Sequence, residues 1–481
     1  MEGALLPHWV GAVSIWATSP WLDAALAARL PFALLLGLTL IAVWYATFNL
    51  ARNRAAQPLP FAFGGEANAI DYARAVADGA LLAMIATLGL LQLGHETTPE
   101  MAQLAAVASF QWALSAACRR RLGARIGVLV ALPCFAACGA PAMAVALGLG
   151  AAVIVRINSE GETRDLLPFL LVATALAALA AWPVHSWAWR MAPRLDWAQL
   201  GRLWIWFLWP AWALAAWTLW RWRKHLGHSH LLVPLLSLSV ALLTSIVMGA
   251  SDRALMLGLP GIAALAAFAL PTLRRSTSSA IDWCSVTFFS ASASVAWFYF
   301  VAAHTGMPAR AADSVARLLR GFEPQLSVPV IATALLGTVA WLWLVRWRTS
   351  RHRAALWKSL VLPAGGVVLC WLLAMTLWLP AIDHARSYRP LMDRLLAVLP
   401  PNGCIAAPNA ASSLVSALEY YTRRRVDASA QAADGHCASL VLVHRGRSAV
   451  VPPTGWDELA SEQRPTERNE FTLVYRRRVS P

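Results

Sequence analysis

The feature that most constrains this chain is a series of apolar stretches that recur along its first 380 residues. A helix needs about 20 apolar residues to cross the roughly 30 Å hydrocarbon core of a bilayer. Such stretches lie near residues 26–49, 79–93, 101–117, 126–138, 141–155, 166–183, 204–220, 231–248, 254–272, 284–302, 328–346 and 360–380. Only 14% of the residues are charged, whereas a soluble domain has about 25%. We therefore predict a polytopic α-helical membrane protein with about twelve transmembrane helices, and a soluble enzyme is excluded.

The basic residues between these stretches predict which side of the membrane each loop faces. Nineteen Lys and Arg fall in alternate loops, at 50–78, 118–125, 156–165, 221–230, 273–283 and 346–359. The intervening loops, at 94–100, 139–140, 184–203, 249–253 and 303–327, contain seven. Since cytoplasmic loops are enriched in Lys and Arg, the first set is predicted to be cytoplasmic and both chain ends lie outside. The net charge of +15 then reflects membrane topology, and no nucleic-acid partner is expected.

The composition changes after Pro380, and the last hundred residues are polar enough to form a soluble domain. Short apolar stretches typical of strands lie at Cys404–Ala407, Ala438–His444 and Phe471–Tyr475, and helical patterns lie near Ser412–Tyr421 and Trp456–Gln463. We predict a membrane domain over 1–380 and a small α/β domain over 381–481 on the outer, periplasmic face.

Two cysteines of this last region, Cys404 and Cys437, each lie in or beside a predicted strand. A disulfide between them is one interpretation, since the periplasm is oxidising. The other interpretation is a pair of buried thiols.

The interiors of the apolar stretches contain almost no Asp, Glu, Lys or Arg. Ion-coupled transporters usually need ionisable groups near the middle of the membrane, so this placement argues against a transporter. The charges gather instead at helix ends and outer loops, where a water-soluble acceptor could meet a lipid-linked donor. We therefore expect the functional site at the outer interface.

Four short motifs resemble one known family. They are Glu2-Gly3-Ala4-Leu5-Leu6-Pro7-His8-Trp9-Val10-Gly11, Ala27-Ala28-Arg29-Leu30-Pro31, Thr98-Pro99-Glu100-Met101 and Ser251-Asp252-Arg253-Ala254-Leu255-Met256-Leu257-Gly258-Leu259-Pro260. The family is that of the polyprenyl-phosphate-sugar-dependent glycosyltransferases of the GT-C fold, in its aminoarabinose-transferase and protein-mannosyltransferase-like branch. The resemblance implies a GT-C-like membrane domain in the bacterial inner membrane and a sugar donor carried on a polyprenyl phosphate.

One part of the family pattern has no counterpart in this sequence. Members have thirteen helices, a cytoplasmic N-terminus and a first outer loop with an Asp-Glu pair, which supplies a carboxylate base. If Glu2 aligns with the acid of the family's next motif, that first helix and loop are missing here. Two explanations stay open, namely a start codon placed too far downstream or a true loss of the loop.

The resemblance therefore leaves two functions to weigh. The first is an inner-membrane glycosyltransferase that moves a sugar from a polyprenyl-phosphate donor to a lipid, glycan or protein acceptor on the periplasmic face. The alternative is a catalytically inactive relative that acts as a membrane scaffold or accessory subunit.

Acidic residues of the outer loops are the candidates for a catalytic base. Glu100, Glu96 and Glu2 are candidate catalytic residues, because a carboxylate can deprotonate an acceptor hydroxyl. His95 and Glu96 are also candidate ligands of a divalent metal ion, which would stabilise the leaving phosphate. The alternative for the group at 95–100 is a solvated loop in which Thr98 caps the next helix and Glu100 favours its positive end.

Arginines of the outer loops are the candidates for binding the donor phosphate. These candidates are Arg253, Arg190, Arg194 and Arg202, of which the last three lie among several tryptophans. The alternative for those three is anchoring at the membrane interface, and the alternative for Arg253 is a local ion pair with Asp252. The arginines at 310, 317 and 320 are instead typical of an amphipathic helix on the membrane surface.

Overall fold

The computed structural model describes residues 4–19, 21–57, 68–157, 163–180, 182, 195–349, 356–446, 453–467 and 469–478. The chain divides into two compact units. Unit 1 comprises Met1–Ser290 with Ala340–Trp371, and unit 2 comprises Ala291–Val339 with Leu372–Pro481. Three helices, Arg275–Thr305, Val328–Thr349 and Val361–Thr376, each contribute residues to both units. The division at 380 expected from composition therefore stays a prediction.

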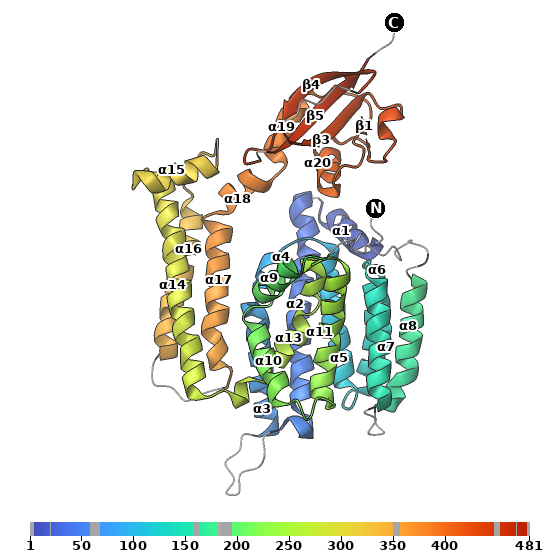
Figure 1. Cartoon of the computed structure of the whole chain (residues 1–481), viewed down its shortest axis with the longest axis vertical. Coiled ribbons are helices and arrows are strands. Elements are labelled where there is room, and N and C mark those ends of the chain that lie inside the picture. The colour runs from blue at the N-terminus through green and yellow to red at the C-terminus, as the bar shows by residue number, and fades with distance from the viewer. Residues whose placement is uncertain are drawn as a thin grey trace. The chain divides into compact units, whose positions relative to one another are not determined.

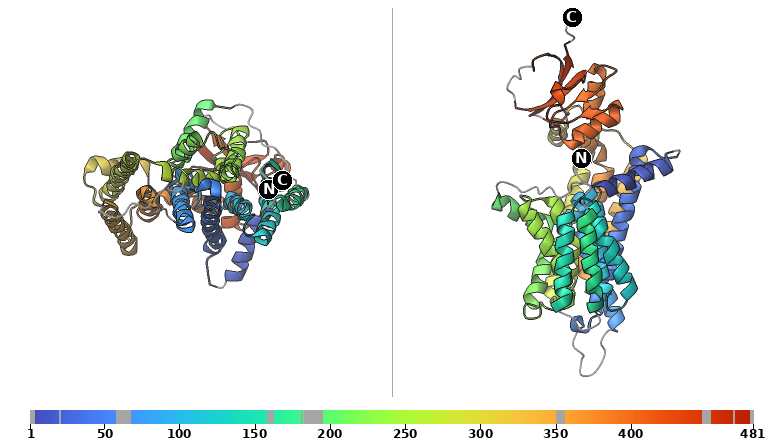
Figure 2. Two further views of the ribbon diagram at one scale, coloured as in Figure 1. Left: turned by 90° about the horizontal axis from the view of Figure 1, so that it is seen from below. Right: turned by 90° about the vertical axis from the view of Figure 1, so that its right-hand side faces the viewer.

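Every apolar stretch expected to be helical contains helix, as Figure 1 shows. The helices up to residue 376, with one exception described with unit 2, are α1 Leu5–Thr18, α2 Ala24–Ala51, α3 Ala69–Ala86, α4 Leu88–Leu93, α5 Pro99–Ala116, α6 Arg121–Ala137, α7 Pro141–Ile157, α8 Leu167–Ala180, α9 Trp197–Phe207, α10 Ala211–Arg221, α11 Ser229–Val247, α12 Asp252–Met256, α13 Leu259–Ala267, α14 Arg275–Thr305, α16 Val328–Thr349 and α17 Val361–Thr376. The longer helices of unit 1 run side by side in Figure 2.

Small residues let the helices of unit 1 approach closely. Helix α2 packs against α3 and α5, and α13 packs against α3, α10 and α11. A Cβ atom at Gly261 of α13 would collide with the backbone carbonyl of Pro234 in α11, so only glycine fits this contact. Such packing is typical of membrane helices, which gain little hydrophobic free energy from meeting one another.

Three of the expected helical stretches are interrupted, which corrects the prediction of continuous helices there. The stretch 204–220 is divided into α9 and α10, which meet at 94°. Pro210 explains this bend, because proline lacks the amide proton and its ring clashes with the preceding turn. The backbone N–H of Leu88 donates to the carbonyl of Trp209 (3.0 Å) and satisfies a group that the break exposes. Similar breaks separate α3 from α4 and α12 from α13.

Five helices in the described residues are long and apolar enough to cross a membrane. They are Ala24–Ala51, Ser229–Val247, Ser276–Thr305, Val328–Thr349 and Trp357–Thr376, and the bent pair α9–α10 makes a sixth if it counts as one span. These helices define a multi-pass membrane protein. The full expectation of about twelve spans stays a prediction.

Besides its parts of α14, α16 and α17, the described residues of unit 2 contain four short helices and a five-stranded sheet. The helices are α15 Ala309–Leu318, α18 Leu379–Arg386, α19 Arg389–Val398 and α20 Ser412–Thr422. The strands are β1 Ile405–Ala406, β2 Val426–Asp427, β3 Ser439–Arg445, β4 Trp456–Glu462 and β5 Glu470–Arg477, in the order β2-β1-β3-β5-β4. Strand β1 is parallel to β2 and β3, whereas β5 is antiparallel to β3 and β4. The three predicted strands and the helix at 412 are confirmed.

The prediction of a helix over Trp456–Gln463 was wrong, because this segment is strand β4. Trp456 and Leu459 are three residues apart, a spacing that suggests one face of a helix. In a strand the same odd spacing places the two side chains on opposite faces. Both faces of this sheet are covered, since Trp456 packs with Cys437 and Tyr475 while Leu459 packs with the side chains of α19 and α20.

The structure joins Cys404 and Cys437 in a disulfide, which confirms the first of the two interpretations of this pair. The bond closes a loop with a sequence separation of 33 residues. It therefore fixes the start of β3 beside β1 within the sheet.

Candidate functional site

The loop between α4 and α5 and the first turn of α12 form one site at an end of unit 1. Helix α5 begins at Pro99, a residue suited to a first helical position, and places Glu100 in its first turn. Thr98 occupies the position before the helix, but its side chain makes no capping hydrogen bond. On the other segment, the hydroxyl of Ser251 accepts from the Ala254 amide (3.3 Å) and fixes the start of α12.

The guanidinium of Arg253 bridges the two acids of the α4–α5 loop region. Its Nη1 donates to Oε2 of Glu100 (2.9 Å), and its Nη2 donates to Oε2 of Glu96 (3.1 Å). Asp252 instead accepts from the backbone N–H of Arg253 (2.8 Å). We call Glu96, Glu100 and Arg253 the acid–arginine cluster.

The acid–arginine cluster lies partly open to solvent. The side chains of Arg253, Glu96 and Glu100 are 44%, 32% and 21% exposed. Burial alone would lower the pKa of Arg253, but the nearby carboxylates of Glu100 and then Glu96 outweigh it and raise the pKa. The arginine is thus held fully charged, and two carboxylates against one guanidinium leave the cluster formally negative.

His95 stands beside the cluster but adds no positive charge to it. Its ring lies 4.4 Å from the ring of Trp371 in α17, measured between centroids. Partial burial lowers the pKa of His95, against the opposing influence of Glu96 and a backbone hydrogen bond at Leu91. The imidazole is therefore neutral at pH 7. No sequence pattern indicated a role for Trp371, which lies inside the last apolar stretch.

A divalent metal ion does not fit the site as the described residues form it. No group of three or more His, Cys, Asp and Glu side chains among those residues is arranged to hold a metal. Glu96 is engaged by Arg253, and His95 packs on Trp371. The predicted pairing of His95 with Glu96 as metal ligands thus gains no support.

The remaining predicted residues are distributed differently. Arg202 is exposed on α9, which packs against both α4 and α12. No acidic side chain in the described segments pairs with Arg202. Glu2, Arg190 and Arg194 lie outside the described residues.

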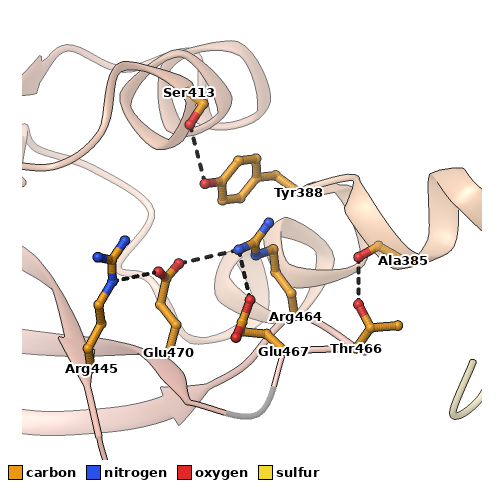
Figure 3. A network of polar contacts seen from close by, with 8 residues as sticks. All are labelled: Ala385, Tyr388, Ser413, Arg445, Arg464, Thr466, Glu467 and Glu470. Carbon is orange, nitrogen blue, oxygen red and sulfur yellow. Dashed lines mark hydrogen bonds and ion pairs between the residues drawn. The ribbon is translucent and has the colours of Figure 1, made fainter. Parts of the chain in front are cut away.

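A second polar site lies within unit 2. A cavity of about 700 Å³ is lined by Arg317 and Arg320 near α15 and by residues of the segment 461–467. Figure 3 shows the polar contacts that hold this segment in place. Arg464 pairs with Glu467 (3.3 Å) and Glu470 (3.4 Å) and stacks on the ring of Tyr388, while the hydroxyl of Thr466 donates to the carbonyl of Ala385 (2.8 Å). The rim of the cavity is therefore fixed to α18 and α19.

Two solved structures share the fold of the chain. A crystal structure of ArnT from Cupriavidus metallidurans bound to undecaprenyl phosphate aligns with a TM-score of 0.63 at 15% identity, over 98% of this chain and 88% of that chain. The apo structure of the same protein aligns with a TM-score of 0.59 at 15% identity, over 98% and 87%. No family model and no curated protein matches the sequence. The chain has an ArnT-like fold, and the GT-C resemblance of its motifs is confirmed at the level of the fold.

Proposed function

We propose that this protein is a glycosyltransferase that takes a sugar from a polyprenyl-phosphate donor, with the acid–arginine cluster as its reaction site. The observation that carries the proposal is the fork of Arg253 between Glu96 and Glu100. It combines a cation suited to a phosphate with carboxylates suited to base catalysis. The ArnT structure of the same fold has undecaprenyl phosphate bound, which supports this donor class.

The reaction would proceed by exchange of the partners of Arg253. The incoming donor phosphate binds the guanidinium of Arg253 and displaces the carboxylate of Glu100 or Glu96 from it. That carboxylate removes the proton of the acceptor hydroxyl as its oxygen attacks C1 of the sugar. The bond between C1 and the phosphate oxygen breaks, and the polyprenyl phosphate leaves with its new charge facing Arg253. No step requires a metal ion.

The proposal also covers the location and the acceptor. The Lys and Arg asymmetry of the loops supports an inner-membrane protein with the acid–arginine cluster and the C-terminal region on the periplasmic side. Unit 2 offers a polar cavity of about 700 Å³ in which a lipid, glycan or protein acceptor would find hydrogen-bond partners. The alternative function is that of an inactive scaffold, in which the cluster is only a structural ion pair.

The test compares the purified chain in liposomes with its Arg253→Ala variant. Two readouts are measured, namely binding of undecaprenyl phosphate and sugar transfer from a panel of undecaprenyl-phosphate sugars. We expect Arg253→Ala to weaken binding and to slow transfer by about 100- to 1,000-fold, the usual cost of removing a group that stabilises developing charge. The matched control is Arg74→Ala, which removes an exposed arginine paired with Asp71.

Two outcomes would contradict the proposal. One is an Arg253→Ala variant that binds and transfers as well as the unchanged chain. The other is an unchanged chain that binds no undecaprenyl phosphate and transfers no sugar, which would favour the scaffold function.

A further inference from the structure

A basic pocket lies at the opposite end of unit 1 from the acid–arginine cluster. Helix α5 connects the two ends, since Glu100 stands in its first turn and Arg119 and Arg120 follow its last. At 1.5 Å per residue the helix separates them by about 25 Å. The pocket has a volume of about 350 Å³ and is lined by Tyr45, Phe48, Asn49, Arg52, Trp112, Arg119 and Arg120. We call it the arginine pocket.

The side chains of the three arginines in the pocket make different contacts. Arg119 holds the end of α2, because its guanidinium donates to the backbone carbonyls of Asn49 (3.2 Å) and Arg52 (2.9 Å). Arg52 lies over the ring of Phe48, at 5.4 Å from the centroid. Arg120 is exposed. Within the described segments, no backbone carbonyl accepts a hydrogen bond from the side chain of Arg52 or Arg120, so their N–H groups can reach a ligand.

Among the residues that the structure describes, no carboxylate pairs with these arginines. None of the residues that line the pocket is acidic, and across the described ranges no ion pair joins Arg52, Arg119 or Arg120 to an Asp or Glu. Burial and the neighbouring Arg52 lower the pKa of Arg119, which is the expected response of one cation to another. Three guanidinium groups around one small cavity create a local demand for an anion.

We infer that the arginine pocket binds the phosphate group of an anionic phospholipid. Planar guanidinium groups recognise phosphate oxygens through paired hydrogen bonds, and a volume of about 350 Å³ admits a phosphate with its glycerol. The charge distribution predicts this end of the protein to be cytoplasmic, where anionic lipid headgroups meet basic pockets between membrane helices.

An apolar track leads from the bilayer to the pocket. Helix α2 exposes Leu34, Leu38 and Ile41 at roughly helical spacing, and the same face continues to Tyr45 at the pocket wall. An acyl chain can lie along this face while its headgroup reaches Arg52 and Arg120. This continuity favours a lipid over a free phosphate ion as the source of the phosphate.

The test is native mass spectrometry of the purified full chain, titrated with phosphatidylglycerol or with phosphatidylcholine. We expect bound phosphatidylglycerol to exceed bound phosphatidylcholine in the unchanged chain. Each of Arg52→Gln and Arg120→Gln should lower the phosphatidylglycerol affinity about fivefold, with a larger loss when they are combined. The combined Arg52→Lys and Arg120→Lys variant should recover part of the loss, because it keeps the charge but not the paired hydrogen bonds.

Two control variants make the result specific. Arg54→Gln removes an exposed arginine from the short helix Arg54–Ala56, next to the pocket but not part of its lining. It should bind phosphatidylglycerol as the unchanged chain does. Arg253→Ala should also leave this binding intact, so the result is independent of the proposed transferase function.

A competition arm with inorganic phosphate distinguishes the two sources of the anion. If millimolar phosphate does not displace phosphatidylglycerol, the lipid is the ligand. If phosphate binds with the same dependence on Arg52 and Arg120 and the lipid does not, the phosphate site stands but its ligand is soluble. The inference is overturned if the glutamine variants, folded as judged by their elution and melting temperature, bind both probes as the unchanged chain does.

Discussion

The two ends of unit 1 both place arginine beside the ends of helices, yet they balance its charge in opposite ways. In the acid–arginine cluster one guanidinium faces two carboxylates, at 2.9 and 3.1 Å. In the arginine pocket three guanidinium groups share a cavity, and none of its described lining residues carries a carboxylate. The same residue type is therefore paired with carboxylates at one end and lines a cavity with other arginines at the other.

The difference in charge balance determines how an anion could bind at each end. A guanidinium already matched by carboxylates can accept a phosphate only by exchange, which suits a substrate that arrives and leaves. Guanidinium groups without carboxylate partners are stabilised whenever an anion binds. Such an arrangement suits a lipid that stays bound.

The largest expected effect concerns the side of the membrane that each end faces. Cys118 is exposed and lies directly before Arg119 of the arginine pocket. A membrane-impermeant maleimide should label Cys118 only after spheroplasts are permeabilised, since the basic loops predict this end to be cytoplasmic. Labelling is measured as a mass shift that the Cys118→Ser variant lacks.

A matched variant reports on the other end. Thr97 is exposed between Glu96 and Glu100, so Thr97→Cys in the Cys118→Ser background should be labelled in intact spheroplasts. Labelling of Cys118 in intact spheroplasts would place the arginine pocket on the periplasmic side and contradict the predicted topology. It would also remove the argument for a cytoplasmic lipid.

The next effect separates the roles of the two acids. Glu100→Gln and Glu96→Gln each keep the size of the side chain but remove the base. We expect the variant that lacks the catalytic base to slow transfer by about 100-fold or more, and the other by about tenfold or less. Equal, small losses in both would indicate that the pair only orients Arg253.

The third effect compares the stability that an arginine contributes at each end. Arg119→Ala removes hydrogen bonds to the backbone at the end of α2, so the free energy of unfolding should fall by about 2 kcal/mol. Arg253→Ala removes partly exposed ion pairs and should cost about 1 kcal/mol or less. Melting temperatures in one detergent provide the comparison. A larger loss for Arg253→Ala would mean that the cluster is structural.

The smallest effect concerns His95. Its lowered pKa means that the folded state resists protonation, so the unfolded state takes up the proton first as pH falls below the ordinary value of 6.5. Stability should therefore decline slightly from pH 7 towards pH 5.5, and His95→Gln should remove part of that decline. Melting temperatures of the two proteins across this range measure it. A decline that His95→Gln leaves unchanged would assign the pH dependence to other groups.

The sequence predicted the parts of the acid–arginine cluster but not their meeting. Glu96, Glu100 and Arg253 were each expected to lie in outer loops, because hydropathy and loop charge place them there. More than 150 residues separate Arg253 from either acid, and only the packing of α12 against α4 and α5 brings them together. The local ion pair of Arg253 with Asp252 was the simpler expectation, since those residues are neighbours.

The arginine pocket was not predicted, although its three arginines had been assigned to basic loops. Arg52, Arg119 and Arg120 were counted as members of basic cytoplasmic loops. A count of charges per loop contains no information on which loops lie side by side. The contact between α2 and α5 turns two such loops into one cavity.

The sequence by itself determined the helical membrane plan, the polar C-terminal region and the candidate charges, because hydropathy and helix propensity depend on neighbours along the chain. The tertiary structure decided where Pro210 bends a helix, that Trp456 begins a strand, and which charges are matched. These outcomes depend on groups that are distant in sequence and meet only when helices and strands pack. Arg253 and Arg52 are alike as residues, and only their surroundings differ, since the described structure pairs Arg253 with carboxylates and places Arg52 beside other arginines.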